Sequence, residues 1–496
     1  MGGQGWPFGR PYAVLALPGL TNRKSPLRDK RHRLAVLGIT PSRFWNIRLA
    51  KVQLWQPQIT NLTELPVPPT GNDLLTRHLQ TVLGELLQDE PVIILTGART
   101  VGKSTVFAAC AGFHGVTVLD LDDIETRRAV TADPGLFVAA DRPAPVCIDE
   151  FQHVPLLLDA IKSELNRDLR AGRYVLTGST RYSSLPAASQ SLTGRAHVVT
   201  MWPLSQGELT QRREGALDIL VTDPAALVAS TPSPHTRADY EQIVLAGGFP
   251  LALAREAGRA RDRWFRDFVT LVVERDVMEI RKVRQRQVLP QVLQRLAGQT
   301  GQVVNIANIA DSVGLDAATV KNYLGLLEAV FLIHRLEPFT RSAANRAIRS
   351  AKVHAVDTGL AAYLTGLTQQ KLSGRVPAIL TQFGHLVETF TVNELMKQAG
   401  WAQQEVEFSH FRTRDQQEVD LVIETSAGSV AAIEVKASGT VADHDFAGLR
   451  LLRDKLGSAF VGGAVVNLGQ RSYTYEDRLH VLPLDRLWAP RDEVHA

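Results

Sequence analysis

Short apolar runs alternate with longer amphipathic stretches along residues 67–215. The runs Val92–Leu95 and Val146–Ile148 have the length and the apolar side chains of buried strands. Before the first run, apolar residues between Leu74 and Leu87 recur every three or four positions, which predicts an amphipathic helix. Strands that alternate with helices favour a parallel sheet covered on both faces. We therefore expect an α/β fold for this part of the chain.

The pattern changes after residue 215. Proline, serine and threonine are concentrated between Asp218 and Ala238, and this composition predicts a flexible connection. Residues from about 240 to 340 have apolar positions at helical spacing instead. Charges of both signs between Arg259 and Arg286 predict a solvated helix face within this helical part.

Two of the predicted helices are separated by a glycine-containing turn. Residues 306–315 and then 319–324 have the helix, glycine-containing turn and second helix of a helix-turn-helix. Lys321 and Asn322 stand where such a unit addresses a DNA major groove. The second helix carries a single basic residue, however, and continues into the apolar run 326–331. This favours a structural or protein-contacting winged helix over a DNA reader.

The segment GARTVGKS, Gly97–Ser104, follows the first predicted strand and precedes a predicted helix. Its glycines allow the backbone to curl so that amide N–H groups face a polyphosphate, and the helix N-terminus adds its positive end. The lysine would reach the β- and γ-phosphates, and the serine hydroxyl would bind the accompanying Mg²⁺. The sequence thus predicts a site for ATP and Mg²⁺ built from Gly97, Gly102, Lys103, Ser104 and Thr105.

A second motif, Val146–Glu150, is an apolar strand that ends in two acids, as a Walker B strand does. Asp149 would hold Mg²⁺ through water, and Glu150 would polarise the water that attacks the γ-phosphate. Another short strand ends at Thr177 and Ser179. Either residue would sense the γ-phosphate, or the strand end would cap the next helix.

The sequence LTGR, Leu192–Arg195, follows this strand. Arg195 is a candidate catalytic residue that would reach a nucleotide on its own chain or on a neighbouring subunit, which makes a homo-oligomer a candidate assembly. The alternative is an ordinary surface arginine.

A second group of chemically active residues lies near the C-terminus. Glu388 and Glu394 fall on a predicted helix, and Asp420 ends the later segment 417–420. Glu434 and Lys436 are two positions apart in the next strand, so their side chains share one face. A β-hairpin would bring this face and Asp420 into one acidic pocket, whereas without a pocket the acids would belong to a solvated hairpin. Glu394 is not on the helix face of Glu388, and we expect it to meet solvent.

Residues of roughly 75 to 485 resemble a prokaryotic group of AAA-type ATPases that carry a C-terminal domain of unknown function. The resemblance implies an α/β fold: a P-loop NTPase core of the ASCE kind with a parallel sheet, a helical lid with a winged-helix-like unit, and an α/β restriction-endonuclease-like C-terminal domain. The motifs occur in the family's order. They are GARTVGKS (97–104), VLDLDD (118–123), CIDEFQ (147–152), LTGST (176–180), LTGR (192–195), PLSQGEL (203–209), GGFP (247–250), ERDV (274–277), VDTGL (356–360), FGHLVETF (383–390), EVDLVIE (418–424) and IEVKAS (433–438).

Four regions are expected from these patterns and the resemblance. They are a basic extension at 1–66, a P-loop ATPase core at 67–215, a linker with helical lid and winged-helix-like unit at 216–345, and a nuclease-like domain at 346–490.

The C-terminal acids and lysine also resemble the core of PD-(D/E)xK nucleases, in the style of junction resolvases. This resemblance implies metal-assisted phosphodiester hydrolysis. Asp420 and Glu434 would bind Mg²⁺ or Mn²⁺, and Glu388 would complete or orient the site. Lys436 would position the attacking water. A fold that keeps these residues can equally serve as a binding platform without activity.

The composition limits the class of protein. A chain of 496 residues can bury two or three cores. Cys110 and Cys147 are the two cysteines and stand in apolar contexts, so neither a disulfide framework nor a cysteine zinc site is indicated, and a cytoplasmic location fits. No apolar run approaches the ~20 residues that span a bilayer, and no membrane partner is expected.

The net charge of +4 is unevenly distributed. Residues 1–60 hold ten lysines and arginines against one acid, which leaves 45 basic and 50 acidic residues in the remainder. The extension would be a phosphate-binding arm with salt-dependent contacts, or an idle tail outside the natural product. The charge of the remainder does not favour DNA binding.

Two functions of different classes remain. In the first, ATP hydrolysis moves the lid and gates a metal-dependent nuclease that acts on DNA or RNA. In the second, the chain is an ATP-responsive switch that binds a protein partner and carries a catalytically silent nuclease-like domain. Both functions use ATP binding by the P-loop.

Overall fold

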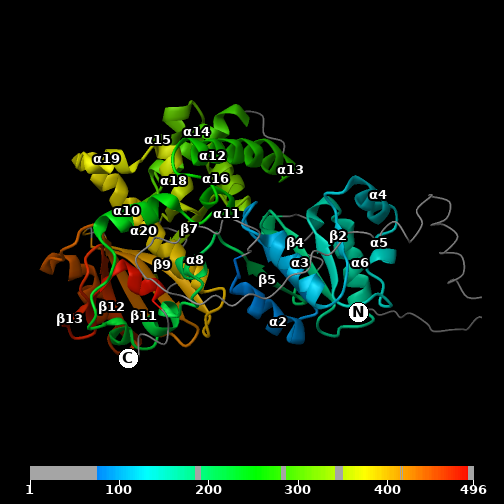
Figure 1. Ribbon diagram of the computed structural model, residues 1–496, viewed down its shortest axis with the longest axis horizontal. Coiled ribbons are helices and arrows are strands. Elements are labelled where there is room, and N and C mark those ends of the chain that lie inside the picture. Colours follow the sequence, from blue (N-terminus) through cyan, green and yellow to red (C-terminus); the bar gives the residue numbers. More distant parts are fainter. Residues whose placement is uncertain are drawn as a thin grey trace, which may run out of the picture. The chain divides into compact units, whose positions relative to one another are not determined.

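The described part of the chain covers most of the predicted regions. The computed structural model describes residues 75–184, 192–280, 286–340, 350–413, 415 and 417–489 (Figure 1). The predicted basic extension, residues 1–66, lies outside these described residues.

The first sheet is five-stranded and parallel throughout. Its strand order is β2-β3-β4-β1-β5, so the strand before the P-loop lies between two neighbours and is buried. The expected parallel sheet is confirmed. The strands are β1 (Val92–Thr96), β2 (Val118–Asp120), β3 (Val146–Asp149), β4 (Tyr174–Gly178) and β5 (Ala196–Thr200).

Helices cover both faces of this sheet (Figure 1). Ile93 and Leu95 pack with two helices on one face, whereas Val92 and Ile94 pack with three helices on the other. This division follows from the alternation of side chains along a strand, and it explains why β1 is apolar at every position. On the first face lie α2 (Leu79–Asp89) and α3 (Lys103–Phe113), and on the second α4 (Ile124–Ala132), α5 (Pro134–Phe137) and α6 (Leu156–Leu165).

The segment predicted as a flexible connection is packed instead. Leu217 and Tyr240 are buried in a hydrophobic core that also contains residues of the C-terminal part of the chain. The prolines and threonines that suggested a linker start helices: Pro224 is the first residue of η5, and Thr236 caps the helix that follows. The elements here are α8 (Gln206–Thr210), α9 (Ala216–Leu220), η5 (Pro224–Leu227) and α10 (Arg237–Ala246).

The next elements are helices, in the region where a lid was predicted, and we refer to them as the lid. Phe265 and Phe268 of its longest helix pack against Phe249, while the charged residues of that helix are mostly exposed, as expected. After Leu271 the helix continues as a π-helical turn, a feature that often accompanies functional sites. The lid comprises α11 (Pro250–Leu253), α12 (Arg259–Leu271), η6 (Val272–Asp276) and α13 (Val277–Ile280).

A helix, a short strand, two helices and a β-hairpin follow the lid. The two predicted helices are present, and Gly314 between them has a positive φ of 67°. Lys321 and Asn322 are exposed, whereas the apolar side of their helix is buried in the core shared with the lid. The elements are α14 (Leu289–Gly298), β6 (Gln302–Val303), α15 (Ile306–Val313), α16 (Ala317–Ala329), β7 (Ile333–Pro338) and β8 (Lys352–Ala355).

The hairpin belongs to a nine-stranded mixed sheet, in the order β13-β14-β12-β11-β10-β9-β7-β8-β6. β7 pairs with β8 and also with β9, so the sheet crosses the domain boundary expected at residue 345. β7 pairs with β8 along residues 333–336 and with β9 at residues 337–338. The remaining strands are β9 (Val406–Arg412), β10 (Glu418–Thr425), β11 (Val430–Lys436), β12 (Phe460–Asn467), β13 (Tyr473–Glu476) and β14 (Leu479–Pro483).

This mixed sheet also has helices on both faces. Leu421 and Ile433 pack with α20, whereas Val422 and Ala432 pack with α21 on the opposite face. Among the described residues, no helix is both long enough and apolar enough to cross a membrane. The helices of this part are α18 (Thr358–Thr365), α19 (Gln369–Ser373), α20 (Pro377–Gln398) and α21 (Ala447–Leu456).

Candidate nucleotide-binding site

The P-loop joins β1 to α3 at the carboxyl edge of the parallel sheet. Gly97 approaches the Met201 carbonyl so closely that an added Cβ would lie 2.2 Å from its oxygen, so a larger residue does not fit. Gly102 has a φ of 98°, in the left-handed region that glycine adopts without strain. The close approach at Gly97 and the left-handed backbone at Gly102 therefore each favour glycine.

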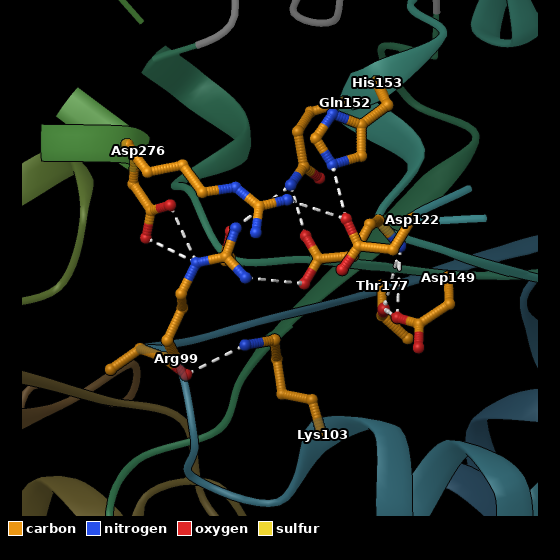
Figure 2. Close-up of polar contacts among 12 residues, drawn as sticks. Arg99, Lys103, Asp122, Asp149, Gln152, His153, Thr177 and Asp276 are labelled. Carbon is orange, nitrogen blue, oxygen red and sulfur yellow. Dashed lines mark hydrogen bonds and ion pairs between the residues drawn. The ribbon is translucent and has the colours of Figure 1, made fainter. Parts of the chain in front are cut away.

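Lys103 is folded into the P-loop (Figure 2). Its Nζ donates hydrogen bonds of 2.8 Å to the carbonyls of Gly97 and Ala98, and the residue is only 5 % exposed. Burial lowers the pKa of the ammonium from 10.5 to about 8. Ser104 and Thr105, in the first turn of α3, are exposed and available to a ligand.

Asp149 ends β3 beside the P-loop. Its carboxylate accepts hydrogen bonds from the Thr177 hydroxyl and from the Glu150 backbone N–H. Burial raises the pKa of Asp149, and hydrogen bonds from the hydroxyls of Thr177 and Ser104 offset this only in part. The Ser104 hydroxyl and the Asp149 carboxylate are hard oxygen donors of the kind that Mg²⁺ prefers, so these residues fit the predicted ion.

Glu150 has an unusual backbone for its residue type. Its φ is 51°, in the left-handed region, and such strain is characteristic of functional sites. The Gln152 side chain donates to the Glu150 carboxylate and, at 3.3 Å, to the Ser179 hydroxyl. Of the two predicted phosphate sensors, Thr177 thus contacts Asp149, and Ser179 contacts the partner of Glu150.

Arg99 is a site residue that the sequence reasoning missed. Its Nε donates to both carboxylate oxygens of Asp276, at 2.7 and 2.6 Å, and its Nη1 lies 3.9 Å from Glu150 Oε1. Figure 2 shows Arg99 turned towards Asp276, with Lys103 nearby. Asp276 belongs to η6 of the lid, 177 positions away in sequence, so no local pattern reveals the pair.

A second contact joins the lid to the loop after β2. Arg275 Nη2 donates to Asp122 Oδ1 at 2.9 Å, and His153 Nε2 lies 3.1 Å from the same oxygen. Unlike Asp276, both Arg275 and Asp122 are partly exposed, and exposed pairs of this kind contribute little stability.

Arg195 does not reach the nucleotide site of its own chain. It precedes Ala196, which pairs with Val92 at the amino end of β1, whereas the P-loop follows the carboxyl end of that strand. Its Nη1 donates to Asn166 Oδ1 at 2.7 Å. The expected contact within one chain is therefore wrong, because a strand of five residues separates Arg195 from the P-loop edge.

A buried arginine, Arg77, holds the P-loop backbone through hydrogen bonds. Arg77 donates to the Val101 carbonyl at 2.5 Å and to the Trp202 carbonyl at 2.7 Å. Its Nε forms a 2.9 Å ion pair with Glu208, which lies in the predicted PLSQGEL motif. The motif thus supports the P-loop backbone.

Glu394 is fully buried, contrary to the prediction that it meets solvent. It accepts a 2.9 Å hydrogen bond from the Gln206 backbone N–H and pairs with Lys397 at 2.6 Å. Lys397 also donates to the Leu204 carbonyl. The face of α20 that helical spacing assigned to solvent is covered by the segment at the start of α8.

The predicted C-terminal acids do assemble, through the β10–β11 hairpin that the spacing suggested. Asp420 accepts a hydrogen bond from the Val435 backbone N–H at 2.9 Å, and Glu434 pairs with Lys436 at 2.7 Å. Glu388 reaches the same place from α20 through a shared partner, Lys352.

Lys352 occupies the centre of this acidic cluster. Its Nζ lies 2.7 Å from Glu388, 2.7 Å from Glu418 and 2.9 Å from Asp420, and the residue is 1 % exposed. Burial opposes its charge, but Asp420 and Glu388 raise the pKa of the ammonium above its usual value. Lys352 is therefore a firmly held internal cation, which the sequence reasoning missed because the residue lies 68 positions from Asp420.

The cluster does not fit the predicted Mg²⁺ or Mn²⁺. Glu388 and Asp420 already pair with the Lys352 ammonium, and Glu434 already pairs with Lys436. Burial and repulsion from Asp420 raise the pKa of Glu388 well above its usual value and that of Glu434 to about 8. Within the described part of the chain, no three His, Cys, Asp or Glu side chains are arranged to hold a metal ion.

Three family descriptions match successive parts of the chain. Residues 89–210 match an AAA domain. Residues 237–371 match a domain of unknown function (DUF8612), and residues 383–487 match another (DUF4143). The second match extends past residue 345, as the mixed sheet does.

Similar proteins include an uncharacterised protein of Mycobacterium tuberculosis, 24% identical over 407 residues that cover 82% of each chain. An uncharacterised Haemophilus influenzae protein is 24% identical over 241 residues, or 47% of this chain and 55% of that protein.

Among solved structures, a Walker-type ATPase of Pyrococcus abyssi matches 60% of this chain and 98% of its own, with 15% identity and a TM-score of 0.36. The Thermotoga maritima RuvB Holliday junction branch migration motor matches 55% and 93%, with 16% identity and a TM-score of 0.27. At these TM-scores neither similarity is used to assign the fold, which rests on the P-loop motif and the order of the strands. On those observations and the family match, residues 89–210 form an AAA-type domain with the fold of a P-loop ATPase.

Proposed function

We propose that the chain is an Mg²⁺-dependent ATPase that acts as a nucleotide-responsive switch. One observation carries the proposal: Lys103, Asp149 and Glu150 lie at the same edge of the parallel sheet. The P-loop at this edge has glycines with positive φ at positions 97 and 102. ATP is the expected nucleotide.

Each of these residues has a defined role in the proposal. Lys103 would exchange the carbonyls of Gly97 and Ala98 for phosphate oxygens. Ser104 and Asp149 would hold Mg²⁺, which neutralises charge on the phosphates when it is bound. Glu150, held by Gln152, would orient the attacking water.

The C-terminal domain is proposed to be catalytically silent. Lys352 within 2.9 Å of both Glu388 and Asp420 supports this function over a metal-dependent nuclease. The mixed sheet and the Glu434–Lys436 pair support a nuclease-like ancestry, and the helix-strand-helix-helix-hairpin order of residues 289–355 supports a winged-helix-like unit. In this proposal the winged-helix-like unit and the C-terminal domain bind a partner protein.

The test compares wild type with Lys103→Ala and Asp420→Ala in two assays. The first is ATP turnover with Mg²⁺, and the second is nicking of plasmid DNA and cleavage of RNA with Mg²⁺ or Mn²⁺. We expect Lys103-dependent turnover, and no cleavage by wild type above the Asp420→Ala level.

Turnover that persists in Lys103→Ala would contradict the ATPase assignment. Metal-dependent cleavage that Asp420→Ala abolishes would contradict the silent domain and restore the nuclease function. Circular dichroism of each variant checks that it is folded.

A further inference from the structure

Arg99 stands inside the P-loop, between Gly97 and Gly102, yet its side chain is held by the lid. Its Nε donates to both oxygens of Asp276, which is 1 % exposed. Charge-assisted hydrogen bonds of this length are among the stronger polar contacts in proteins, particularly away from water. Asp276 therefore fixes the direction of the guanidinium.

One of the two Nη nitrogens of Arg99 approaches Glu150, the residue proposed to orient the attacking water. Nη1 lies 3.9 Å from Glu150 Oε1, and Nη2 is buried with no hydrogen-bond partner in the described part of the chain. A guanidinium has five N–H donors, and a buried donor without an acceptor is costly. Among the described residues, Nη2 thus lacks a hydrogen-bond acceptor, and Nη1 lies beyond hydrogen-bond distance from Glu150 Oε1.

A γ-phosphate would supply those acceptors. Its oxygens would lie between the P-loop backbone and Glu150, because Lys103 and Glu150 act on the two sides of that group in the proposed function. Arginine matches phosphate geometry with paired N–H donors, which a lysine cannot do.

We propose that Arg99 contacts the γ-phosphate of bound ATP from the same chain, and that Asp276 is the positioning residue that holds it there. This inference rests on the proposed ATPase function. It makes the contact with the γ-phosphate depend on a residue of the lid. Arg99 takes the role within one chain that Arg195 cannot fill.

The proposal links the lid to the nucleotide state. Asp276 ends the π-helical turn between α12 and α13, so a change in the direction of Arg99 acts on the helix that continues into the lid core. ATP would add contacts to Arg99 that ADP lacks. The Arg99–Asp276 pair would therefore make lid position sensitive to the third phosphate.

The test measures dissociation constants of ATP and ADP, with kcat and KM, for the full-length protein. The variants are Arg99→Ala, Arg99→Lys, Asp276→Ala and the Arg99→Ala/Asp276→Ala double variant. Affinities for ATP are measured with Glu150→Gln added, so that hydrolysis does not interfere. Arg275→Ala is the matched control, because it removes a lid-to-core ion pair that does not involve Arg99.

We expect Arg99→Ala to weaken ATP binding about 10- to 100-fold while ADP binding changes little, as for a lost hydrogen bond between charged groups. Arg99→Lys should recover only part of the loss. Asp276→Ala should shift the ATP-to-ADP ratio in the same direction but add nothing in the Arg99→Ala background, because it acts through Arg99. Arg275→Ala should leave the ratio unchanged.

Equal losses for ATP and ADP in folded Arg99→Ala and Arg99→Lys would overturn the phosphate contact. Additive effects in the double variant, or the same shift in Arg275→Ala, would overturn the positioning role of Asp276. These outcomes differ from failure of the proposed function, in which wild type itself shows no Lys103-dependent turnover.

Discussion

Three buried or partly buried cations lie at the two candidate sites. Lys103 is held by two P-loop carbonyls, Lys352 by three acids, and Arg99 by Asp276. The two lysines show opposite consequences of burial. Burial lowers the pKa of Lys103, which has no acid at contact distance among the described residues, whereas neighbouring acids raise the pKa of Lys352. Lys103 is therefore ready to gain an anionic partner, and Lys352 already has its partners.

The pKa of Lys103 predicts proton uptake on ATP binding. In the free protein the ammonium loses its proton above about pH 8, instead of the ordinary 10.5. Phosphate oxygens favour the charged form, so at pH 9 ATP should bind together with a proton, and its affinity should fall as pH rises from 8 to 10. Calorimetry at pH 9 in buffers of different ionisation enthalpy measures the uptake. Lys103→Arg, which stays charged, should show none; equal uptake in both proteins would contradict the assignment.

The same linkage affects folding with the opposite sign. Because the folded state has the lower pKa, the unfolded state binds more protons between pH 8 and 10.5, and the cost of burying Lys103 decreases as pH rises through this range. This contribution alone favours the folded state at high pH.

Local patterns predicted the P-loop residues because the loop, its strand and its helix are contiguous in sequence. They could not predict Arg99–Asp276 or Lys352–Asp420, whose partners come from distant elements. Lys352 also starts a short strand without any motif around it. Predictions at the residue scale thus failed where tertiary contacts alone create the environment.

Helix α20 shows how an element's surroundings override its sequence pattern. Spacing along the helix placed Glu394 away from Glu388 and hence in solvent. The helix is buried on most sides, however, because the mixed sheet and the segment beginning α8 contact different faces. A helix enclosed in this way has no solvent stripe, so helical periodicity cannot assign its polar residues. In the same way, the connection predicted between Asp218 and Ala238 contributes Leu220 and Leu227 to a hydrophobic core.

Removing the Glu394 carboxylate should destabilise the protein strongly. Glu394→Ala leaves Lys397 buried without its acid and leaves the Gln206 N–H without an acceptor. The expected loss is about 3–5 kcal/mol of unfolding free energy, as for other broken buried pairs. Urea denaturation measures it, with Glu85→Ala on the exposed side of α2 as control, expected within about 0.5 kcal/mol of wild type. A change below about 1 kcal/mol at position 394 would show that the pair is not structurally important.

Among the described residues, two sets of polar side-chain contacts connect the P-loop to distant elements. One runs from Arg99 to Asp276 in the lid. The other runs from the Val101 carbonyl through Arg77 to Glu208 in α8, whose first residue, Gln206, contacts Glu394 of α20. A contiguous route does not by itself demonstrate coupling, which requires an element with two states that both sites bias. The lid is joined to the P-loop by the Arg99–Asp276 pair and to the loop after β2 by Arg275–Asp122, and it is the element that we expect to have two states.

Hydrogen exchange of the Glu150→Gln protein, compared with Mg²⁺-ATP and with Mg²⁺-ADP, tests the switch most directly. The account predicts slower amide exchange with ATP in the P-loop, in residues 272–280 of the lid, and at the end of α20 near Glu394. Nucleotide-dependent differences confined to residues 97–105 would contradict it, since ATP would then bind without any response in the lid or the C-terminal domain.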